Sequence, residues 1–280
     1  MESGLPAHYK PRQHAPIWET PSPDWREKLW AAVEKNSGSY PSTVFFRADD
    51  IGAGGRAFDE LCRLFRHHDV PLGMAVVPAW LSEVRKKQLF ESAPLDEPLW
   101  GWHQHGWRHV NWQRAGKKSE FGEQRPFEKQ WRDIRQGLLK MQDIFGDHFL
   151  RVFTPPWNRL SVATIRILQD LEFEAASTAG PFPRGNKTAI KNIRVQIDLH
   201  TRKEKDGAAD FNELLDEIAG IGSKREPVGL MIHHHRMTAF AFEFLDELLS
   251  AIKAHPRIQT IGLKGMLEKE YEEQAGSGLR

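Results

Sequence analysis

The sequence predicts an α/β fold, a distorted barrel of the (β/α)7 type built as one large domain. Short apolar segments rich in β-branched and aromatic residues alternate with segments whose apolar residues recur at helical spacing. The chain has 280 residues, and a single barrel commonly uses about 200 to 250. Reactive side chains also follow several of the apolar segments directly, as is typical where barrel strands end.

The strands are predicted from short runs bounded by chain-breaking residues. The first run is followed by glycines at 52, 54 and 55, and the second is stopped by Pro78. We expect seven or eight strands, at 42–47, 72–77, 99–112 together with its loop, 151–154, 173–177, 193–199, 228–232 and 258–261.

The helices are predicted from apolar residues that fall on one face. In the longest, Trp131, Ile134, Leu138, Met141 and Ile144 share a side, and Ser161 is the expected N-cap of a later helix. We expect helices at 25–35, 57–68, 81–90, 127–145, 161–171, 210–219 and 239–254.

The predicted domain organisation has three parts. Residues 1–38 form a lead-in and first helix, residues 39–267 form the barrel, and residues 268–280 form a polar tail. The first 25 residues contain five prolines and no apolar run of signal-peptide length, and no stretch approaches 18 apolar residues. We therefore expect a cytoplasmic protein without a membrane partner.

The charge balance and the cysteine content exclude some classes of partner and of covalent link. Lys plus Arg number 39 and Asp plus Glu 38, so no overall field attracts nucleic acid, which we do not expect as a partner. The single cysteine, Cys62, lies in an apolar helical pattern, is interpreted as a core residue, and allows no intramolecular disulfide.

The reactive side chains gather after four predicted strands. In a parallel barrel these strand ends meet at one mouth, where active sites form. The groups are Asp49 and Asp50, then His103, His105 and His109, then residues 154–157, and last His233, His234 and His235.

One combination of these residues predicts a metal site. His105 and His109 are four residues apart, and with the carboxylate of Asp50 they can fill three positions around a divalent metal, leaving one for water. Asp49 would then lie beside the metal and accept a proton. The alternative is structural: the histidines cap a loop and the two aspartates close a turn.

Two further groups of residues, three tryptophans and three histidines, can each be interpreted in two ways. Trp102, Trp107 and Trp112 form either a packed cluster or a surface for stacking sugars. The three histidines at 233–235 are either one core residue and two solvated ones, or they include a general acid. Their position directly after a barrel strand favours the general acid.

Four motifs resemble those of one family, the polysaccharide deacetylases with a NodB-homology domain (carbohydrate esterase family 4). Residues 46–52, F-R-A-D-D-I-G, resemble its T-F-D-D-G motif, and residues 105–109, H-G-W-R-H, resemble H-[ST]-x-x-H. Residues 153–158, F-T-P-P-W-N, resemble R-P-P-[YW], and residues 229–233 resemble the strand that carries the catalytic histidine. The resemblance spans roughly residues 40–262 and suggests a divergent bacterial branch.

The resemblance implies a mechanism with named roles. A divalent ion, Zn²⁺ in the family, would be held by Asp50, His105 and His109, with Asp49 as base and His233 as acid. The substrate would be a carbohydrate that loses an N-acetyl or similar acyl group. Residues expected to bind substrate or support the site are Pro156, Trp157, Asn158, Asp198, His234 and Trp107.

The chain departs from the family at three positions. Thr154 stands in place of the arginine that orients the aspartate, so either Arg47 or Arg159 substitutes for it or the aspartate is less constrained. Gly106 replaces the Ser or Thr of the histidine motif, and Val110 replaces a proline. No aspartate that orients the acid histidine is evident, and Asp198 is our candidate.

Three other functions compete with this one. A non-haem iron oxygenase also uses two histidines and a carboxylate, although the barrel pattern argues against it. A sugar-binding module with impaired catalysis would explain the altered positions 106 and 154. Another metal-dependent amidohydrolase, acting on a different C–N bond, would use the same groups.

Overall fold

The computed structural model describes residues 14–36, 41–184 and 188–268, and in these ranges it confirms the predicted barrel. All strands are parallel, in the order β2-β3-β4-β5-β6-β7-β1-β8, and β1 also pairs with β2. Seven strands, β1 to β7, therefore close into a barrel. Strand β8 pairs with the first residues of β1, from Ser42 to Val44. The strands are β1 (Ser42–Ile51), β2 (Leu72–Val76), β3 (Trp100–His105), β4 (Phe149–Thr154), β5 (Ala175–Thr178), β6 (Lys191–Asp198), β7 (Val228–Ile232) and β8 (Ile258–Thr260).

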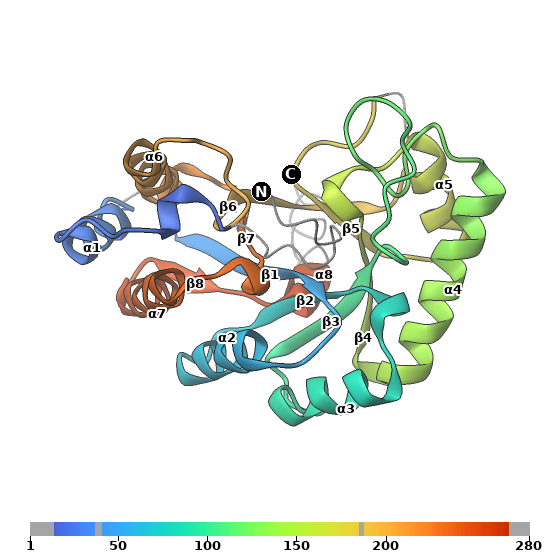
Figure 1. The fold of residues 1–280 in the computed structure, drawn as a ribbon, viewed down its shortest axis with the longest axis horizontal. Helices are drawn as coiled ribbons and strands as arrows, with labels where there is room; N and C mark the ends of the chain where they lie inside the picture. The colour runs from blue at the N-terminus through green and yellow to red at the C-terminus, as the bar shows by residue number, and fades with distance from the viewer. Residues whose placement is uncertain (1–13, 37–40, 185–187, 269–280) are drawn as a thin grey trace, which may run out of the picture.

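Helices surround the strands (Figure 1). Helices α1, α6 and α7 lie on one side, α2 and α3 lie beside them, and α4 and α5 lie on the opposite side. The helices are α1 (Trp25–Glu34), α2 (Arg56–His67), α3 (Glu83–Ser92), α4 (Phe127–Phe145), α5 (Val162–Asp170), α6 (Gly207–Ala219), α7 (Ala239–Ala254) and α8 (Leu263–Glu268).

The alternation of side chains along each strand separates two cores. On β1, Val44 and Phe46 belong to the large core shared with the helices, whereas Phe45 belongs to a smaller core with Val152 and Met231. The smaller core fills the barrel interior below the mouth. Apolar packing therefore occupies the lower barrel and leaves the upper end to polar side chains.

Helix α8 closes the opposite end of the barrel. Leu263 is buried, and a side-chain carbon added at Gly73 or Gly101 would lie 2.7 Å or 3.6 Å from its side chain. Glycine at the inward positions of β2 and β3 thus makes room for this plug.

The segment before the barrel packs onto it. Trp18 is fully buried, donates a hydrogen bond from Nε1 to the Leu199 carbonyl at 2.8 Å, and packs edge-on against Phe244 of α7. Trp25 of α1 packs against Phe240 of the same helix.

Most predicted elements agree with the structure, and the differences have local causes. The bounds of α4, β7 and α7 match the prediction, and Ser161 caps α5 within a capping box. Strand β1 extends through Ile51, four residues beyond the prediction, and α3 begins two residues late because the chain turns through a 3₁₀ helix, η3 (Pro78–Trp80). Of the predicted polar tail, residues 269–280 lie outside the described residues.

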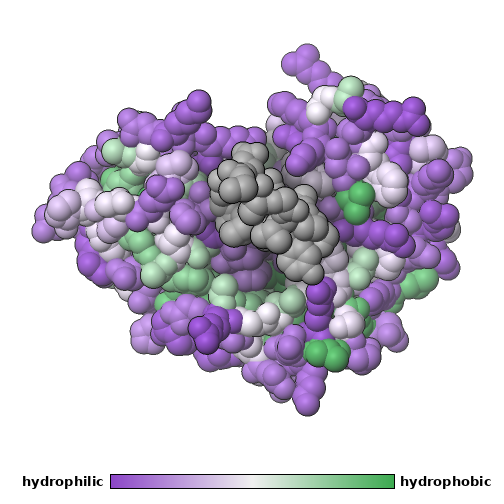
Figure 2. Space-filling view, viewed as in Figure 1, coloured by the Kyte–Doolittle hydropathy of each residue, from purple (hydrophilic) through white to green (hydrophobic). Residues whose placement is uncertain are grey.

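The surface is mainly hydrophilic on the face in view, with scattered hydrophobic residues (Figure 2). In the described part of the chain, no helix has the length and apolar content needed to cross a membrane.

Cys62 gives a direct test of this packing. Its side chain is fully buried in the large core, and burial raises the pKa of the thiol to about 12. We expect no reaction with a chromogenic disulfide reagent at pH 8 in the native protein, and one thiol per chain in guanidinium chloride. Stoichiometric reaction of the native protein within minutes would contradict the packing described.

Candidate metal centre and active site

Both acidic residues of the site come from the end of β1. Regular alternation turns Arg47 and Asp49 into the barrel, and it would turn Asp50 outward. Asp50, however, has φ of +61°, and the register between β1 and β2 shifts between Ala48 and Ile51. This irregularity brings two consecutive carboxylates to the same mouth.

Asp50 lies between the two predicted metal-binding histidines. Its Oδ1 is 3.3 Å from Nε2 of His105, which ends β3, and 3.2 Å from Nε2 of His109. The potential ligand atoms of the three residues all lie within 4.8 Å of one another. Two donors bonded tetrahedrally at about 2.0 to 2.1 Å would be about 3.3 Å apart, so the spacing fits a small divalent ion.

The lack of a hydrogen-bond donor for Oδ1 of Asp50 in the described part of the chain also favours a metal site. This oxygen is buried and accepts no well-aligned hydrogen bond from the described residues. Nδ1 of His105 donates to the Thr154 carbonyl at 3.0 Å, which leaves its Nε2 facing Asp50. A buried carboxylate oxygen facing an imidazole nitrogen is well suited to a cation between them, a proton or a metal ion.

The lowered pKa of His109 fits a neutral metal ligand, whereas the raised pKa of His105 means that a metal would have to displace the proton that Asp50 and Asp49 favour on this ring. Burial lowers the pKa of His109 to about 4, with His105 adding to the effect, so His109 is neutral at pH 7. Burial opposes ionisation of Asp50, but His105 and His109 outweigh it and lower its pKa. Burial would lower the pKa of His105, yet Asp50 and Asp49 raise it.

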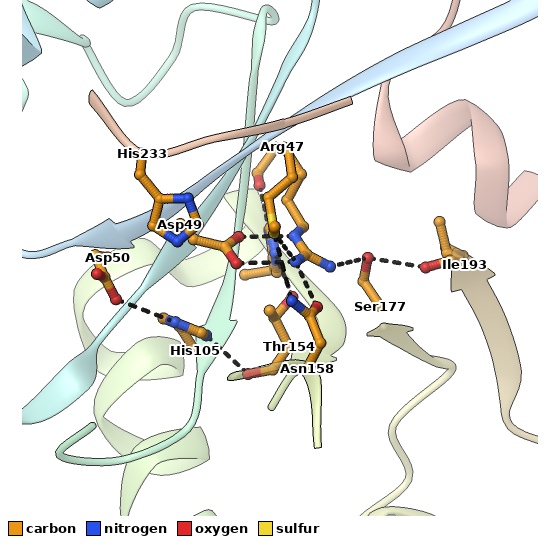
Figure 3. Close-up of polar contacts among 12 residues, drawn as sticks. Arg47, Asp49, Asp50, His105, Thr154, Asn158, Ser177, Ile193 and His233 are labelled. Carbon is orange, nitrogen blue, oxygen red and sulfur yellow. Dashed lines mark hydrogen bonds and ion pairs between the residues drawn. The ribbon is translucent and has the colours of Figure 1, made fainter. Parts of the chain in front are cut away.

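Asp49 forms a two-point ion pair with Arg47 inside the barrel (Figure 3). Nε of Arg47 donates to Oδ1 at 2.7 Å and its second guanidinium nitrogen donates to Oδ2 at 2.8 Å. Burial opposes ionisation of Asp49, but the neighbouring Arg47, with His105 and His233, lowers its pKa overall. Arg47 thus takes the place of the family arginine, whereas Arg159 donates to the Lys118 carbonyl.

Arg47 also donates to three other side chains. The acceptors are Oγ of Ser177 on β5 at 2.8 Å, Oδ1 of Asn158 at 2.7 Å and the sulfur of Met231 on β7 at 3.1 Å. Asn158, predicted as a supporting residue, therefore acts on Asp49 through Arg47.

The histidines after β7 point in different directions. His233 is close enough to Asp49 to help lower the pKa of that carboxyl (Figure 3), and Nε2 of His235 is 3.5 Å from Oδ2 of Asp50. His234, expected to bind substrate or support the site, is buried, with its ring centroid 5.7 Å from that of Phe58 on α2. A 3₁₀ turn starting at His234 breaks the strand alternation, so His235 and not His234 reaches the metal ligands.

Asp198 has a different role from the one predicted. Its Oδ1 accepts hydrogen bonds from the backbone N–H groups of His200 and Thr201, and its Oδ2 accepts from the Thr201 hydroxyl. Asp198 closes the turn after β6 and makes no contact with His233 among the described interactions. The backbone N–H of His233 donates instead to Nδ1 of His200 at 3.3 Å.

A second buried carboxylate organises the loop that carries His109. Glu120 accepts hydrogen bonds from the backbone N–H groups of Trp107, Arg108 and His109, at 3.3, 2.8 and 3.1 Å. Burial raises the pKa of Glu120, and these three donors oppose that shift. Three successive N–H groups form a nest for an anion, so Glu120 fixes the backbone at the second metal ligand.

Glu120 also explains the glycine at position 106. Gly106 has φ of +55°, and a side-chain carbon there would lie 2.4 Å from Oε2 of Glu120 and 2.6 Å from Pro156. The carboxylate and the proline occupy the space that a family serine or threonine would need.

The predicted proline and tryptophan residues border the metal ligands in different ways. The Trp157 ring lies 4.4 Å from that of His109, centroid to centroid, and Trp80 lies 5.9 Å away. Pro156 is buried against Gly106. Trp107 packs against the large core, and its carbonyl accepts from the N–H of Ala79.

A groove of about 530 Å³ is lined in part by His235, whose Nε2 is 3.5 Å from Oδ2 of Asp50. It is bordered by the loop after β1, Phe58, Trp80, Arg85, His234 and His235. This volume lies within the range of small-ligand sites, so a substrate group can approach the three ligands from this side.

The sequence analysis did not identify Glu120, Ser177 or Trp80 as site residues, and it did not distinguish His235 from the neighbouring histidines. Glu120 and Ser177 act from distant segments, and no local pattern marks them. His235 is near the predicted acid, but only the backbone turn distinguishes it from His234.

The fold is that of polysaccharide deacetylases, as the resemblance implied. A candidate polysaccharide deacetylase from Mycobacterium smegmatis matches with a TM-score of 0.62 and 12% identity, covering 85% of this chain and 96% of that one. A candidate polysaccharide deacetylase from Pseudomonas aeruginosa matches with a TM-score of 0.58 and 13% identity, covering 91% and 95%. A mutant of a Bacillus subtilis peptidoglycan deacetylase matches with a TM-score of 0.50 and 10% identity, covering 86% and 96%. No family model and no curated protein sequence matches the chain.

The tight space at Gly106 generates a prediction about stability. Gly106→Ser should lower the free energy of unfolding by about 2 to 4 kcal/mol, because the new atoms overlap Glu120 and strain a left-handed residue. Gly116 lies in the same loop with φ of +83° and open space around it, so Gly116→Ser should cost only about 1 kcal/mol. Urea unfolding of both variants measures the difference. Equal losses would show that Glu120 and Pro156 do not fill the space at Gly106.

Proposed function

We propose that this protein is a metal-dependent hydrolase that removes an acyl group, N-acetyl in the simplest case, from a carbohydrate. The observation that carries the proposal is the buried Oδ1 of Asp50 between two imidazole nitrogens, next to the ionised Asp49. The fold shared with the Mycobacterium smegmatis and Pseudomonas aeruginosa proteins supports it.

Asp50, His105 and His109 would hold the metal, and their two nitrogens and one oxygen suit Zn²⁺. A bound Zn²⁺ polarises an acyl oxygen and lowers the pKa of water from 15.7 to about 7. His105 would bind the metal through Nε2, because its Nδ1–H donates to the Thr154 carbonyl. The metal would displace from Nε2 the proton that Asp50 and Asp49 favour on this ring.

Asp49 is the general base in this proposal. Arg47 holds its carboxylate by two hydrogen bonds and keeps it ionised. Each carboxylate oxygen has two acceptor sites, so both oxygens can bind Arg47 and one can still take a proton from the attacking water. The ion pair therefore fixes the orientation of the Asp49 carboxylate and leaves an acceptor site free for the proton.

His233 is the general acid, donating a proton to the leaving nitrogen of the sugar. Its ring interacts with Asp49 strongly enough to help lower the pKa of that carboxyl, so proton acceptor and proton donor share the barrel mouth (Figure 3). The closeness of His235 to Asp50 makes His235 the alternative donor.

Replacing each aspartate separates metal binding from proton transfer. Asp50→Ala should lose most of the zinc, because one of three ligands is removed. Asp49→Asn should keep its zinc and release acetate from N-acetylated sugars at least about a hundredfold more slowly, because an amide does not accept the proton. Metal content by mass spectrometry and acetate release measure the two effects.

The control for Asp49→Asn is its folded state. Its amide leaves the buried Arg47 without a counter-charge, so its unfolding midpoint should fall, and assays belong well below that midpoint. Loss of zinc from folded Asp49→Asn in parallel with activity would make Asp49 a ligand. Absence of acetate release by the zinc-loaded parent protein from every N-acetylated sugar would overturn the proposed deacetylation.

The acid can be identified by changing the leaving group. An activated ester needs little protonation, whereas an N-acetyl amide needs much, so His233→Ala should slow the amide at least about tenfold more than the ester. His235→Ala is the matched variant, and kcat for both substrates measures the effect. If only His235→Ala discriminates between amide and ester, the acid is His235.

A further inference from the structure

A second cavity, of about 520 Å³, lies between the loop after His109 and the first turns of α4. It is distinct from the groove beside Asp50, and the mechanism above does not use it. Its lining consists of Arg108, Trp112, Arg114, Gln124, Arg125, Pro126, Lys129, Arg132, Asp133 and Gln136; we call it the basic pocket.

We propose that the basic pocket binds a negatively charged sugar unit, so that the substrate is an anionic glycan. This inference rests on the proposed function and extends it to a substrate class. It follows from the charge of the lining, from an exposed tryptophan within it, and from its continuity with the metal loop.

The lining is far more positive than the protein as a whole. Five of its side chains are cationic and one is anionic, whereas the whole chain has a formal net charge of +1. Asp133 pairs with the buried Arg125 and lies 3.5 Å from Arg132. Among the described residues, no carboxylate pairs with the side chains of Arg108, Arg114 or Lys129, and a concave site of this kind concentrates anions.

Trp112 gives the pocket a surface for a sugar ring. It is 47% exposed, although large aromatic side chains are usually well buried. The guanidinium of Arg125 lies 5.0 Å from its ring centroid, and Arg125 is itself held by Asp133 and the Glu120 carbonyl. An exposed indole in a fixed position among cations suits an acidic sugar better than a bare anion, because the ring can stack on the sugar face.

The basic pocket shares its framework with the metal site. Arg108 lies between the ligands His105 and His109, and its N–H is bound by Glu120. Trp112 follows His109 by three residues, so their Cα atoms are at most about 11 Å apart. One oligosaccharide can therefore reach both sites, with its acyl group at the metal and its acidic unit in the basic pocket.

The acidic group can be a carboxylate or a sulfate or phosphate ester, since guanidinium and ammonium groups bind all three. The probes are therefore tetrasaccharides of equal length: an N-acetylglucosamine tetramer, one alternating uronic acid with N-acetylglucosamine, and a sulfated N-acetylglucosamine tetramer. Inorganic polyphosphate supplies charge without a sugar ring. Calorimetric titration of the zinc-loaded full chain measures each Kd.

We expect one or both acidic tetrasaccharides to bind more tightly than the neutral tetramer, with an affinity that falls as salt rises. The stronger of the two identifies the acidic group. The double variant Lys129→Glu/Arg132→Glu should weaken acidic binding about tenfold or more. Arg135→Glu, a single charge reversal on α4 outside the pocket lining with half the charge change of the double variant, should leave it within about twofold. Trp112→Ala should also weaken it, and Trp112→Phe should restore part of the loss.

Equal Kd values for neutral and acidic tetrasaccharides would overturn the inference, as would equal effects of the double variant and Arg135→Glu. Polyphosphate binding as tight as acidic-sugar binding, with no effect of Trp112→Ala, would also overturn it. Acidic-sugar binding without hydrolysis of any tetrasaccharide would support the basic pocket and contradict the proposed function. Hydrolysis of neutral and acidic tetramers at equal kcat/KM, unchanged in the double variant, would contradict the basic pocket alone.

Discussion

The buried guanidinium of Arg47 is the constraint around which the barrel mouth is arranged. A fully buried cation is tolerated only if its charge and its N–H groups are compensated. Arg47 obtains this from Asp49 on its own strand, Ser177 on β5 and the Asn158 turn after β4. The same contacts that stabilise the cation hold Asp49 in one orientation and keep it ionised.

A second buried charge organises the other half of the site. Glu120 is fully buried and binds three successive backbone N–H groups of the loop between the two histidine ligands. In the family motif a Ser or Thr occupies position 106; here the carboxylate takes that space, and glycine becomes necessary. The departures at positions 106 and 154 are thus each matched by a buried ionic group, Glu120 and Arg47. At both positions the protein therefore has a buried ionic group where the family motif has a different side chain.

The features that depend on a local sequence pattern could be predicted from the sequence. Alternating strands and helices predicted the barrel, and the spacing of His105 and His109 predicted the cluster with Asp50. Arg47 and Asp49 are two residues apart, which places them on one face of a strand, so their pairing could have been predicted too. The outward position of Asp50 in a regular strand is reversed only by its positive φ. The roles of Glu120 and Asp198 depend on which backbone N–H groups the loops bring next to these carboxylates. The hydrophobic periodicity of the sequence carries no information about such contacts.

The most direct test of this account is an anomalous diffraction map of zinc-soaked crystals recorded at the zinc edge. The account predicts one peak at the barrel mouth, about 2.0 to 2.2 Å from Oδ1 of Asp50 and from Nε2 of both His105 and His109. A peak held by the histidines at 233–235 without Asp50, or no peak at the mouth at zinc concentrations that saturate the protein in solution, would contradict it.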